Sequence, residues 1–148
     1  MSHFKLKSVF FASILTLFLG WTMPSLAAEM MAGSDVTVKE MNDPKLGNIL
    51  VDNKGMTLYT FTNDKDGISS CYDKCAAIWP ALTMSAGQPV LAQGLPGKLG
   101  MSKRTDNTMQ VTYNDMPLYH YSKDQKAGDT VGQGFLGKWY VVKPTKAK

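Results

Sequence analysis

The chain has 148 residues, of which 44% are hydrophobic and 19% charged, with a formal net charge of +4. Two of the 16 Lys and Arg residues, Lys5 and Lys7, precede the mature domain predicted below, which leaves 14 against 12 Asp and Glu. This near-neutral balance, with a few lysines at the C-terminal end, provides no electrostatic footprint for nucleic acid.

The first 28 residues have the layout of a secretory signal peptide. Lys5 and Lys7 precede an apolar run from Val9 to Trp21, and small residues follow Pro24. Cleavage is expected after Ala27 or Ala28. The alternative is a retained membrane anchor, but the run is shorter than the roughly 20 residues that a spanning helix needs. No cysteine follows the small residues, so we expect a periplasmic or secreted protein without a lipid anchor or a membrane span.

Cleavage would leave about 120 residues, which suits one domain with a core of its own but not two. Residues 29–47 show no core pattern and are predicted to be a weakly ordered lead-in, in which Val36-Thr37-Val38 could add an edge strand. Residues 48–143 form the predicted domain, and residues 144–148 a basic tail.

The first half of this domain begins with a hairpin. Ile49–Val51 and Met56–Thr62 are the predicted strands, because turn residues ending in Gly55 separate them. Tyr59 and Phe61 share one face of the return strand, since side chains alternate along it. A helix is predicted from Cys71 to Trp79, with Ser69-Ser70 at its start and Pro80 at its end.

Residues 83–97, rich in Gly and Pro, are predicted to be a loop that joins the two halves. The second half repeats the plan with strands at 98–104, 108–113, 117–122 and 138–143. Asn114-Asp115 is its tight turn, and a long loop stands where the first half has its helix. Pro117 cannot donate to a ladder, so it belongs at a strand start or on an edge.

The two halves are copies of one unit. Residues 56–64, Met-Thr-Leu-Tyr-Thr-Phe-Thr-Asn-Asp, recur sixty positions later as Met-Pro-Leu-Tyr-His-Tyr-Ser-Lys-Asp, and the same offset pairs Val51 with Val111 without a gap. The repeats span about residues 48–82 and 108–142. An isolated hairpin is marginal in water, so we expect the hairpins to bury their aromatic faces against each other. The predicted fold is a small, mainly β, antiparallel domain with pseudo-twofold symmetry and one short helix.

These residues resemble a known family. The resemblance rests on Leu58-Tyr59-x-Phe61-x-x-Asp64, Cys71-x-x-x-Cys75-Ala76-x-x-Trp79-Pro80, Pro117-Leu118-Tyr119-x-Tyr121-x-x-Asp124 and Gly128-Asp129. The chain looks like a member of the secreted-repeat family of unknown function, whose members are often described as predicted lipoproteins with a Yx(F/W/Y)xxD motif. The resemblance implies an exported bacterial protein with a repeat architecture and no established reaction. The lipidated cysteine that many members carry is missing.

Cys71 and Cys75 are the two cysteines of the chain. On one helix face their Cα atoms would lie about 6 Å apart, which a disulfide tolerates. We favour a structural disulfide over a redox-active pair or a metal site. The loop that it closes is so short that the bridge should stabilise only modestly and be reducible.

Eight repeated residues form a candidate ligand cleft: Tyr59, Phe61, Asp64, Trp79, Tyr119, Tyr121, Asp124 and Trp139. In one interpretation each Asp accepts hydrogen bonds from its own loop and each Tyr hydroxyl finds a buried partner. In the sharper one, the two copies line one cleft with paired phenols and carboxylates. We favour the structural interpretation, because folding alone explains the repetition.

No metal or cofactor is predicted. Asp64-x-Asp66-Gly67 resembles part of a calcium loop, but Thr62 stands where the first ligand belongs. Copper would have His120, Met116 and the Met30-Met31 pair. Eight of the ten methionines follow the signal, and Met30, Met31 and Met41 are expected to be exposed, so a sacrificial oxidant sink is a further alternative.

No nucleophile-and-base set is available for a hydrolase, since the mature chain has one histidine and no Ser or Cys motif around it. The sequence also has no phosphate-binding glycine motif. We therefore expect a non-enzymatic binding or interaction domain of the cell envelope, with an unknown envelope ligand or protein as its partner. The alternative is a redox role, through methionine oxidation or through Cys71 and Cys75.

Overall fold

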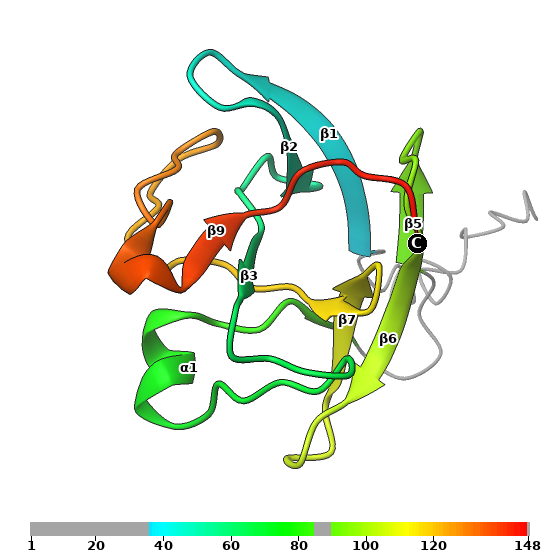
Figure 1. Ribbon diagram of the computed structural model, residues 1–148, viewed down its shortest axis with the longest axis vertical. Helices are drawn as coiled ribbons and strands as arrows, with labels where there is room; N and C mark the ends of the chain where they lie inside the picture. The colour runs from blue at the N-terminus through cyan, green and yellow to red at the C-terminus, as the bar shows by residue number, and fades with distance from the viewer. Residues whose placement is uncertain (1–35, 85–89, 148) are drawn as a thin grey trace, which may run out of the picture. The chain divides into compact units, whose positions relative to one another are not determined.

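A computed structural model describes residues 36–84 and 90–147, which belong to one compact unit (Figure 1). The predicted signal peptide and residues 29–35 of the lead-in lie outside the described residues. The fold is mainly β, as predicted. Its strands are β1 (Val36–Asp43), β2 (Gly47–Asp52), β3 (Tyr59–Phe61), β4 (Thr83–Met84), β5 (Val90–Gln93), β6 (Leu99–Lys103), β7 (Met109–Tyr113), β8 (Met116–Pro117) and β9 (Trp139–Val141). The helical elements are α1 (Lys74–Ile78) and the 3₁₀ turn η2 (Phe135–Gly137).

Three small sheets carry the strands. The first has the order β2-β1-β5, the second pairs β3 with β9, and the third has the order β4-β7-β6 with β8 also on β7. All the pairs are antiparallel except β1 with β5. No helix of the described part of the chain is long and apolar enough to cross a membrane.

The two repeats exchange their last strands. β9 comes from the second repeat but pairs with β3 of the first, and β4 comes from the first repeat but pairs with β7 of the second. Because the sheet pairing crosses between the repeats, neither hairpin is complete without a strand of the other.

A ring of three backbone hydrogen bonds closes each exchange. In the first, Leu50 N–H donates to Val142 (2.9 Å), Val142 N–H to Leu58 (2.9 Å) and Leu58 N–H to Leu50 (3.0 Å). In the second, three residues bond in the same cyclic order: Val111 N–H to Leu82, Leu82 N–H to Leu118, and Leu118 N–H to Val111. The two rings are the backbone signature of the pseudo-twofold symmetry.

Alternation along the strands produces two cores. Leu58 and Leu118 are fully buried in an aliphatic cluster, while the next residues, Tyr59 and Tyr119, are fully buried in an aromatic one. Phe61 packs against the aromatic cluster too, so the prediction that it shares a face with Tyr59 is confirmed.

The predicted offset of sixty residues between the repeats is wrong for the strand that precedes each hairpin turn. The hydrogen-bond rings make Leu50 equivalent to Val111, an offset of 61, whereas Leu58 and Leu118 keep the offset of 60. The reason is turn length: the second hairpin turns tightly at Asn114 and Asp115, both with positive φ (48° and 63°), while the first needs one residue more. The tight turn itself is as predicted.

Two stretches predicted as irregular contain strands. Residues 36–47, part of the expected lead-in, hold β1 and its turn into β2, and β1 lies between β2 and β5 rather than at an edge. The expected linker 83–97 holds β4 and β5. Its Gly and Pro residues flank the four residues of β5 instead of interrupting them, so composition alone hid the strand.

The predicted helix is shorter than expected. Asp73 has a left-handed backbone (φ 51°), so α1 starts only at Lys74 and excludes Cys71. The start signal at Ser69-Ser70 is wrong as well, because no side-chain hydrogen bond caps α1. Ile78, the last residue of α1, is 43% exposed.

Candidate functional site

The centre of the aromatic core is a symmetric stack of four rings. The tryptophans of the two repeats, Trp79 and Trp139, lie face to face with ring centroids 3.9 Å apart and an interplanar angle of 1°. Tyr121 stacks on the outer face of Trp79 (4.1 Å), and its repeat equivalent Phe61 stacks on Trp139 (4.2 Å). Each such pair contributes about 0.5–1.5 kcal/mol beyond area burial, so the stack ties the repeats together across their pseudo-axis. We call Trp79 and Trp139 the Trp pair.

A tyrosine meets the edge of each tryptophan. Tyr59 packs edge-on against Trp79 (5.3 Å), and Tyr119 packs in the same way against Trp139 (5.1 Å). Between the tyrosines, the backbone N–H of each donates to the carbonyl of the other, at 2.8 and 3.0 Å. The two tyrosines therefore lie at the pseudo-axis itself.

Each tyrosine hydroxyl donates to the aspartate of the other repeat. Tyr59 bonds Asp124 Oδ2 and Tyr119 bonds Asp64 Oδ2, both at 2.6 Å. Hydrogen bonds to an ionised group contribute about 1.5–3 kcal/mol. These crossed Tyr–Asp pairs join residues 65 and 55 positions apart, and they are a second lock between the repeats.

The other oxygen of each aspartate holds its own loop. Asp64 Oδ1 accepts from the backbone N–H of Ser70 (2.8 Å), and Asp124 Oδ1 accepts from that of Val131 (3.0 Å). The structure thus contains both features of the structural interpretation: an aspartate bonded to its own loop and a tyrosine hydroxyl with a buried partner.

The phenols are held in their neutral form. Burial, and next the hydrogen bond to Asp124, raise the pKa of Tyr59 well above its usual range. Burial and the bond to Asp64 do the same for the pKa of Tyr119. The pKa of Asp124 is raised as well, mainly because burial disfavours its charged form.

A buried arginine distinguishes one crossed pair from the other. Arg104 Nη1 donates to Ser69 Oγ (2.8 Å) and to Gln110 Oε1 (2.7 Å), and the Ser69 oxygen lies 2.7 Å from the Tyr119 hydroxyl. The hydroxyl oxygen of Tyr59 instead accepts a hydrogen bond from the backbone N–H of Gly132 (3.3 Å). No sequence pattern marks Arg104 as a site residue, because it lies outside the repeated motif and directly after the partly exposed strand β6.

Cys71 and Cys75 form a disulfide with their Cα atoms 5.2 Å apart, so the predicted pairing is confirmed. Cys71 is fully buried and Cys75 partly, and both pack with the aromatic cluster. The bridge links the segment before α1 to its first turn. The carbonyl oxygen of Cys71 also accepts a hydrogen bond from Arg104 Nη2 (2.9 Å), and Arg104 connects the disulfide to the surroundings of Tyr119.

The eight residues of the proposed cleft thus come together, but they pack against one another. Seven are buried and Phe61 is half-buried. Gly132 presses on this core so closely that a Cβ there would lie 2.7 Å from Trp79 Cη2 and 3.0 Å from Tyr59 Cε1. Two surface hollows lie elsewhere, one beside Asp66, Met101 and Asp115 and one beside Tyr113 and Lys143, and neither is lined by any of the eight residues.

Some of the candidate metal ligands and some of the methionines lie in the described part of the chain. Among the described residues no group of three or more His, Cys, Asp and Glu is placed to hold a metal. His120 Nε2 lies 3.0 Å from Asp52 Oδ2. Met41, expected to be exposed, packs against the aromatic cluster, whereas Met101 is 55% exposed. Met30 and Met31 lie outside the described residues.

Comparison with known proteins finds one family. A family model described as a secreted repeat of unknown function matches residues 41–83 and again residues 100–143, together more than half of the chain. Both matches extend beyond the predicted repeats; the first ends at the first residue of β4, and the second includes β9. Neither a search of curated proteins nor one of solved structures finds a match.

Proposed function

The chain belongs to the family of secreted repeats of unknown function and is therefore an exported protein, and from that premise we propose that it is a non-enzymatic interaction domain of the cell envelope. It acts in the periplasm or outside the cell, soluble after signal cleavage, and needs no cofactor. The crossed Tyr–Asp pairs support this proposal, since the hydroxyl and carboxyl groups of the predicted cleft are buried and bonded to one another.

One residue carries the proposal: Leu136 in η2. It is 79% exposed and has a left-handed backbone (φ 51°, ψ 21°), a conformation that costs a residue with a Cβ about 1–2 kcal/mol. Glycine would fit this position better, so the fold alone does not favour a leucine. Strain combined with an exposed apolar side chain is typical of residues kept for contact with a partner.

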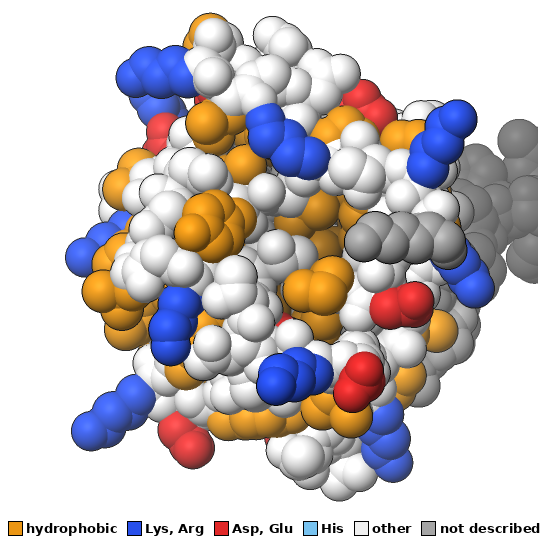
Figure 2. Space-filling view, viewed as in Figure 1, with side chains coloured by type: hydrophobic (Ala, Val, Ile, Leu, Met, Phe, Trp, Pro, Cys, Tyr) orange, Lys and Arg blue, Asp and Glu red, His pale blue; other side chains and the backbone are white. Residues whose placement is uncertain are grey.

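Two further exposed apolar residues are next in the chain to Trp79 or to a residue that packs against its ring. Ile78 (43% exposed) precedes Trp79 directly, and Val131 (63% exposed) precedes Gly132, which touches the Trp79 ring. Leu136 follows Phe135, whose ring centroid lies 5.8 Å from that of Trp79. We call these three residues the apolar rim. Figure 2 shows apolar side chains at the edge of the molecule where Figure 1 places α1 and the turn before β9.

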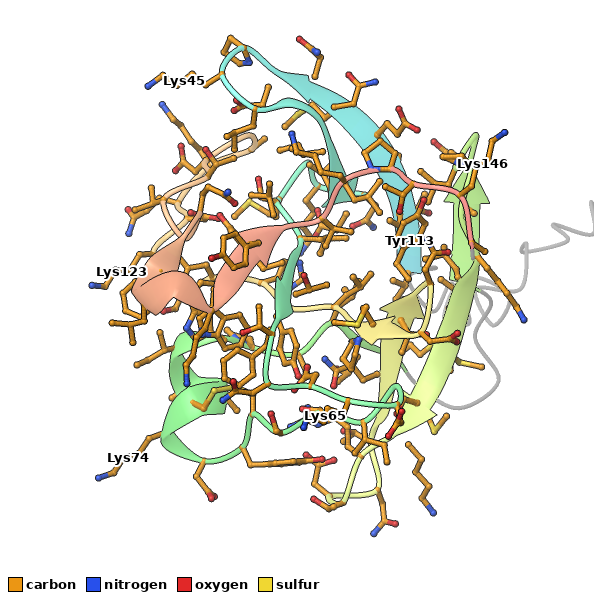
Figure 3. The ribbon with its side chains drawn as sticks, viewed as in Figure 1. Lys45, Lys65, Lys74, Tyr113, Lys123 and Lys146 are labelled. Atoms are coloured by element: carbon orange, nitrogen blue, oxygen red, sulfur yellow. A yellow bond between two sulfur atoms is a disulfide. The ribbon has the colours of Figure 1, made fainter. Side chains whose placement is uncertain are left out.

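Lysines flank the apolar rim. Lys74 opens α1, Lys138 follows η2, and Lys123 follows Ser122, whose N–H donates to the Ile78 carbonyl. Figure 3 shows Lys74 and Lys123 on this side of the molecule. A partner that fits has an apolar centre with carboxylates around it, the usual arrangement of a protein interface.

A protein fits this rim better than a membrane does. Binding in the membrane interface uses a long amphipathic helix with Trp, Phe or Leu along one face, whereas α1 has five residues. The rim has three separate aliphatic side chains on rigid turns, which suits a few contacts in matching pockets.

Site-specific photo-crosslinking in the exporting cells tests the proposal. A photoreactive residue at 131 should yield one protein adduct of defined mass, and one at the exposed Met101 should not. Adding Leu136→Gly should reduce the adduct at 131 by about tenfold, while the free energy of unfolding stays equal or rises by up to about 1 kcal/mol because strain is relieved.

Three results would contradict the proposal: equal adducts at 131 and 101, an adduct that survives Leu136→Gly, or an adduct with the mass of a lipid. The last would assign the rim to a membrane surface.

A redox role through the disulfide is the second candidate. The observation in its favour is that Cys71 and Cys75 are oxidised and pack against the rings. If the protein's function in the envelope depended on this disulfide, Cys71→Ser would abolish that function while leaving the crosslink at 131 unchanged. Loss of the crosslink as well would instead indicate that the bridge only shapes the rim.

A further inference from the structure

We propose that the Trp pair and the crossed Tyr–Asp pairs form a relay for a single oxidising equivalent. An oxidised tryptophan takes an electron from a tyrosine, and the phenol proton moves at the same time to the aspartate that it already bonds. This function is separate from the apolar rim and does not rest on it.

The Trp pair has the geometry to share a positive charge. The two rings are parallel and 3.9 Å apart, and each has a further ring on its outer face at 4.1 or 4.2 Å. A positive charge over an aromatic face is stabilised by the ring, and face-to-face contact lets the charge spread over both indoles. Phe61, half-buried, covers Trp139, so one ring separates the Trp pair from an oxidant at the surface.

The crossed pairs supply the proton acceptor that tyrosine oxidation needs. A phenol that loses an electron becomes a strong acid, and in a buried site its proton must pass directly to a neighbouring base. Each hydroxyl lies 2.6 Å from a carboxylate oxygen, and each ring touches a tryptophan edge. Electron and proton therefore leave the same residue in two directions, without water.

The step is balanced. A one-electron oxidant, such as a peroxyl radical outside the cytoplasm, removes an electron from the Trp pair and is reduced. The resulting tryptophan radical cation recovers an electron from Tyr59, while the Tyr59 proton moves to the Asp124 carboxylate. The products are a neutral tryptophan, a neutral tyrosyl radical and a protonated aspartic acid. No further reactant is needed.

The two crossed pairs are not equivalent, and the oxidising equivalent settles on Tyr59. Beside Tyr119, the guanidinium of Arg104 bonds Ser69, which contacts the phenol, and a nearby positive charge opposes the neutralisation of Asp64. Among the described residues, the groups that bond Asp124 are the Tyr59 hydroxyl and the N–H of Val131, both neutral. The raised pKa of Asp124 agrees with an easier proton transfer there.

Laser photoionisation of tryptophan tests the relay in the protein as its cells export it. The chain has three tryptophans, and cleavage of the predicted signal peptide removes Trp21, so the Trp pair supplies the tryptophan signal of the exported protein. The tryptophanyl and tyrosyl radical absorptions are followed separately in time. We expect the tyrosyl signal to rise as the tryptophanyl signal decays, and more slowly in D₂O because a proton moves with the electron.

Variants identify the electron donor. Tyr59→Phe and Asp124→Asn should each slow the rise at least about tenfold, which is about 1.4 kcal/mol in the barrier. Tyr119→Phe should slow it less. Tyr113→Phe is the matched control, since that hydroxyl bonds the Thr145 carbonyl beside the aliphatic core, and it should leave the rate unchanged.

Three results would overturn the relay: no tyrosyl signal in the protein with all its tyrosines, equal rates of tyrosyl formation in H₂O and D₂O, or an unchanged rate in Tyr59→Phe. The first two use no variant of the crossed pairs, so they remain decisive even where a substitution there fails to fold.

Discussion

Asp124 and Asp52 are two buried aspartates whose pKa values the fold shifts in opposite directions. Burial raises the pKa of Asp124, with the charge of Asp129 adding to the effect. Burial also acts to raise the pKa of Asp52, but the hydrogen bond from His120 and the N–H groups of Met56 and Lys54 outweigh it and hold that pKa below its usual range. These opposite shifts have opposite consequences for stability.

Lowering the pH should therefore change the contributions of Asp52 and Asp124 to the unfolding free energy in opposite directions. A lowered folded pKa contributes stability above the unfolded pKa, and that contribution is lost as the pH falls; a raised one contributes stability at low pH that is lost as the pH rises. We compare unfolding free energies of the wild type with Asp52→Asn and with Asp124→Asn. From about pH 5 down to pH 3, the advantage of the wild type should shrink against Asp52→Asn and grow against Asp124→Asn. Slopes of the same sign would contradict the assigned environments.

At this scale the sequence indicated the site residues but not their partners. The Yx(F/W/Y)xxD spacing places Tyr59 and Asp64 five positions apart, and both repeats have it. The structure pairs each tyrosine with the distant aspartate instead. Spacing within a motif cannot predict this, because two identical copies offer each tyrosine an equivalent partner in either repeat.

The two repeats differ most in the element between their paired strands. The first has α1 and its disulfide there, and the second has the loop 124–138 with η2. Both segments reach the same Trp pair, and the loop does so through Gly132, which has no side chain to hold it away from Trp79 and Tyr59.

Gly132→Ala should thus displace the loop as a unit. Its Cβ would meet two rigid rings, and overpacking of this kind costs about 1–3 kcal/mol. Denaturant unfolding measures the loss, and near-ultraviolet circular dichroism reports the disturbed tryptophans. The neighbouring Val131→Ala, at a 63% exposed position, should change the unfolding free energy by less than about 0.5 kcal/mol. Equal effects of the two variants would mean that the loop does not rest on the stack.

Elements with a strong local pattern were predictable, and those defined by distant pairing were not. The Asn114-Asp115 turn and β9 follow from turn chemistry and alternation. β4 has two residues, too few for any periodicity, and it exists because β7 of the other repeat binds it. The helix was overestimated because Cys71 and Cys75 fit a helical spacing, while the backbone reverses at Asp73.

For the molecule as a whole, duplication and strand exchange make one domain, with an aliphatic and an aromatic core, out of two incomplete units. The duplication was visible in the sequence and predicted a symmetric β domain with its aromatic residues inside. The exchange was not visible, because hydrophobic alternation shows which face is buried but not which strand lies alongside. The same interlocking fills the proposed cleft, which is why we place binding at the apolar rim.

The most direct test of this interlocked interior is a pair of double-mutant cycles. Tyr59→Phe is combined with Asp124→Asn in one cycle and with Asp64→Asn in the other, and each coupling energy is taken from unfolding free energies. The account predicts about 1–3 kcal/mol for the pair across the repeats and less than about 0.5 kcal/mol for the pair within one repeat. A larger coupling between Tyr59 and Asp64 would contradict it.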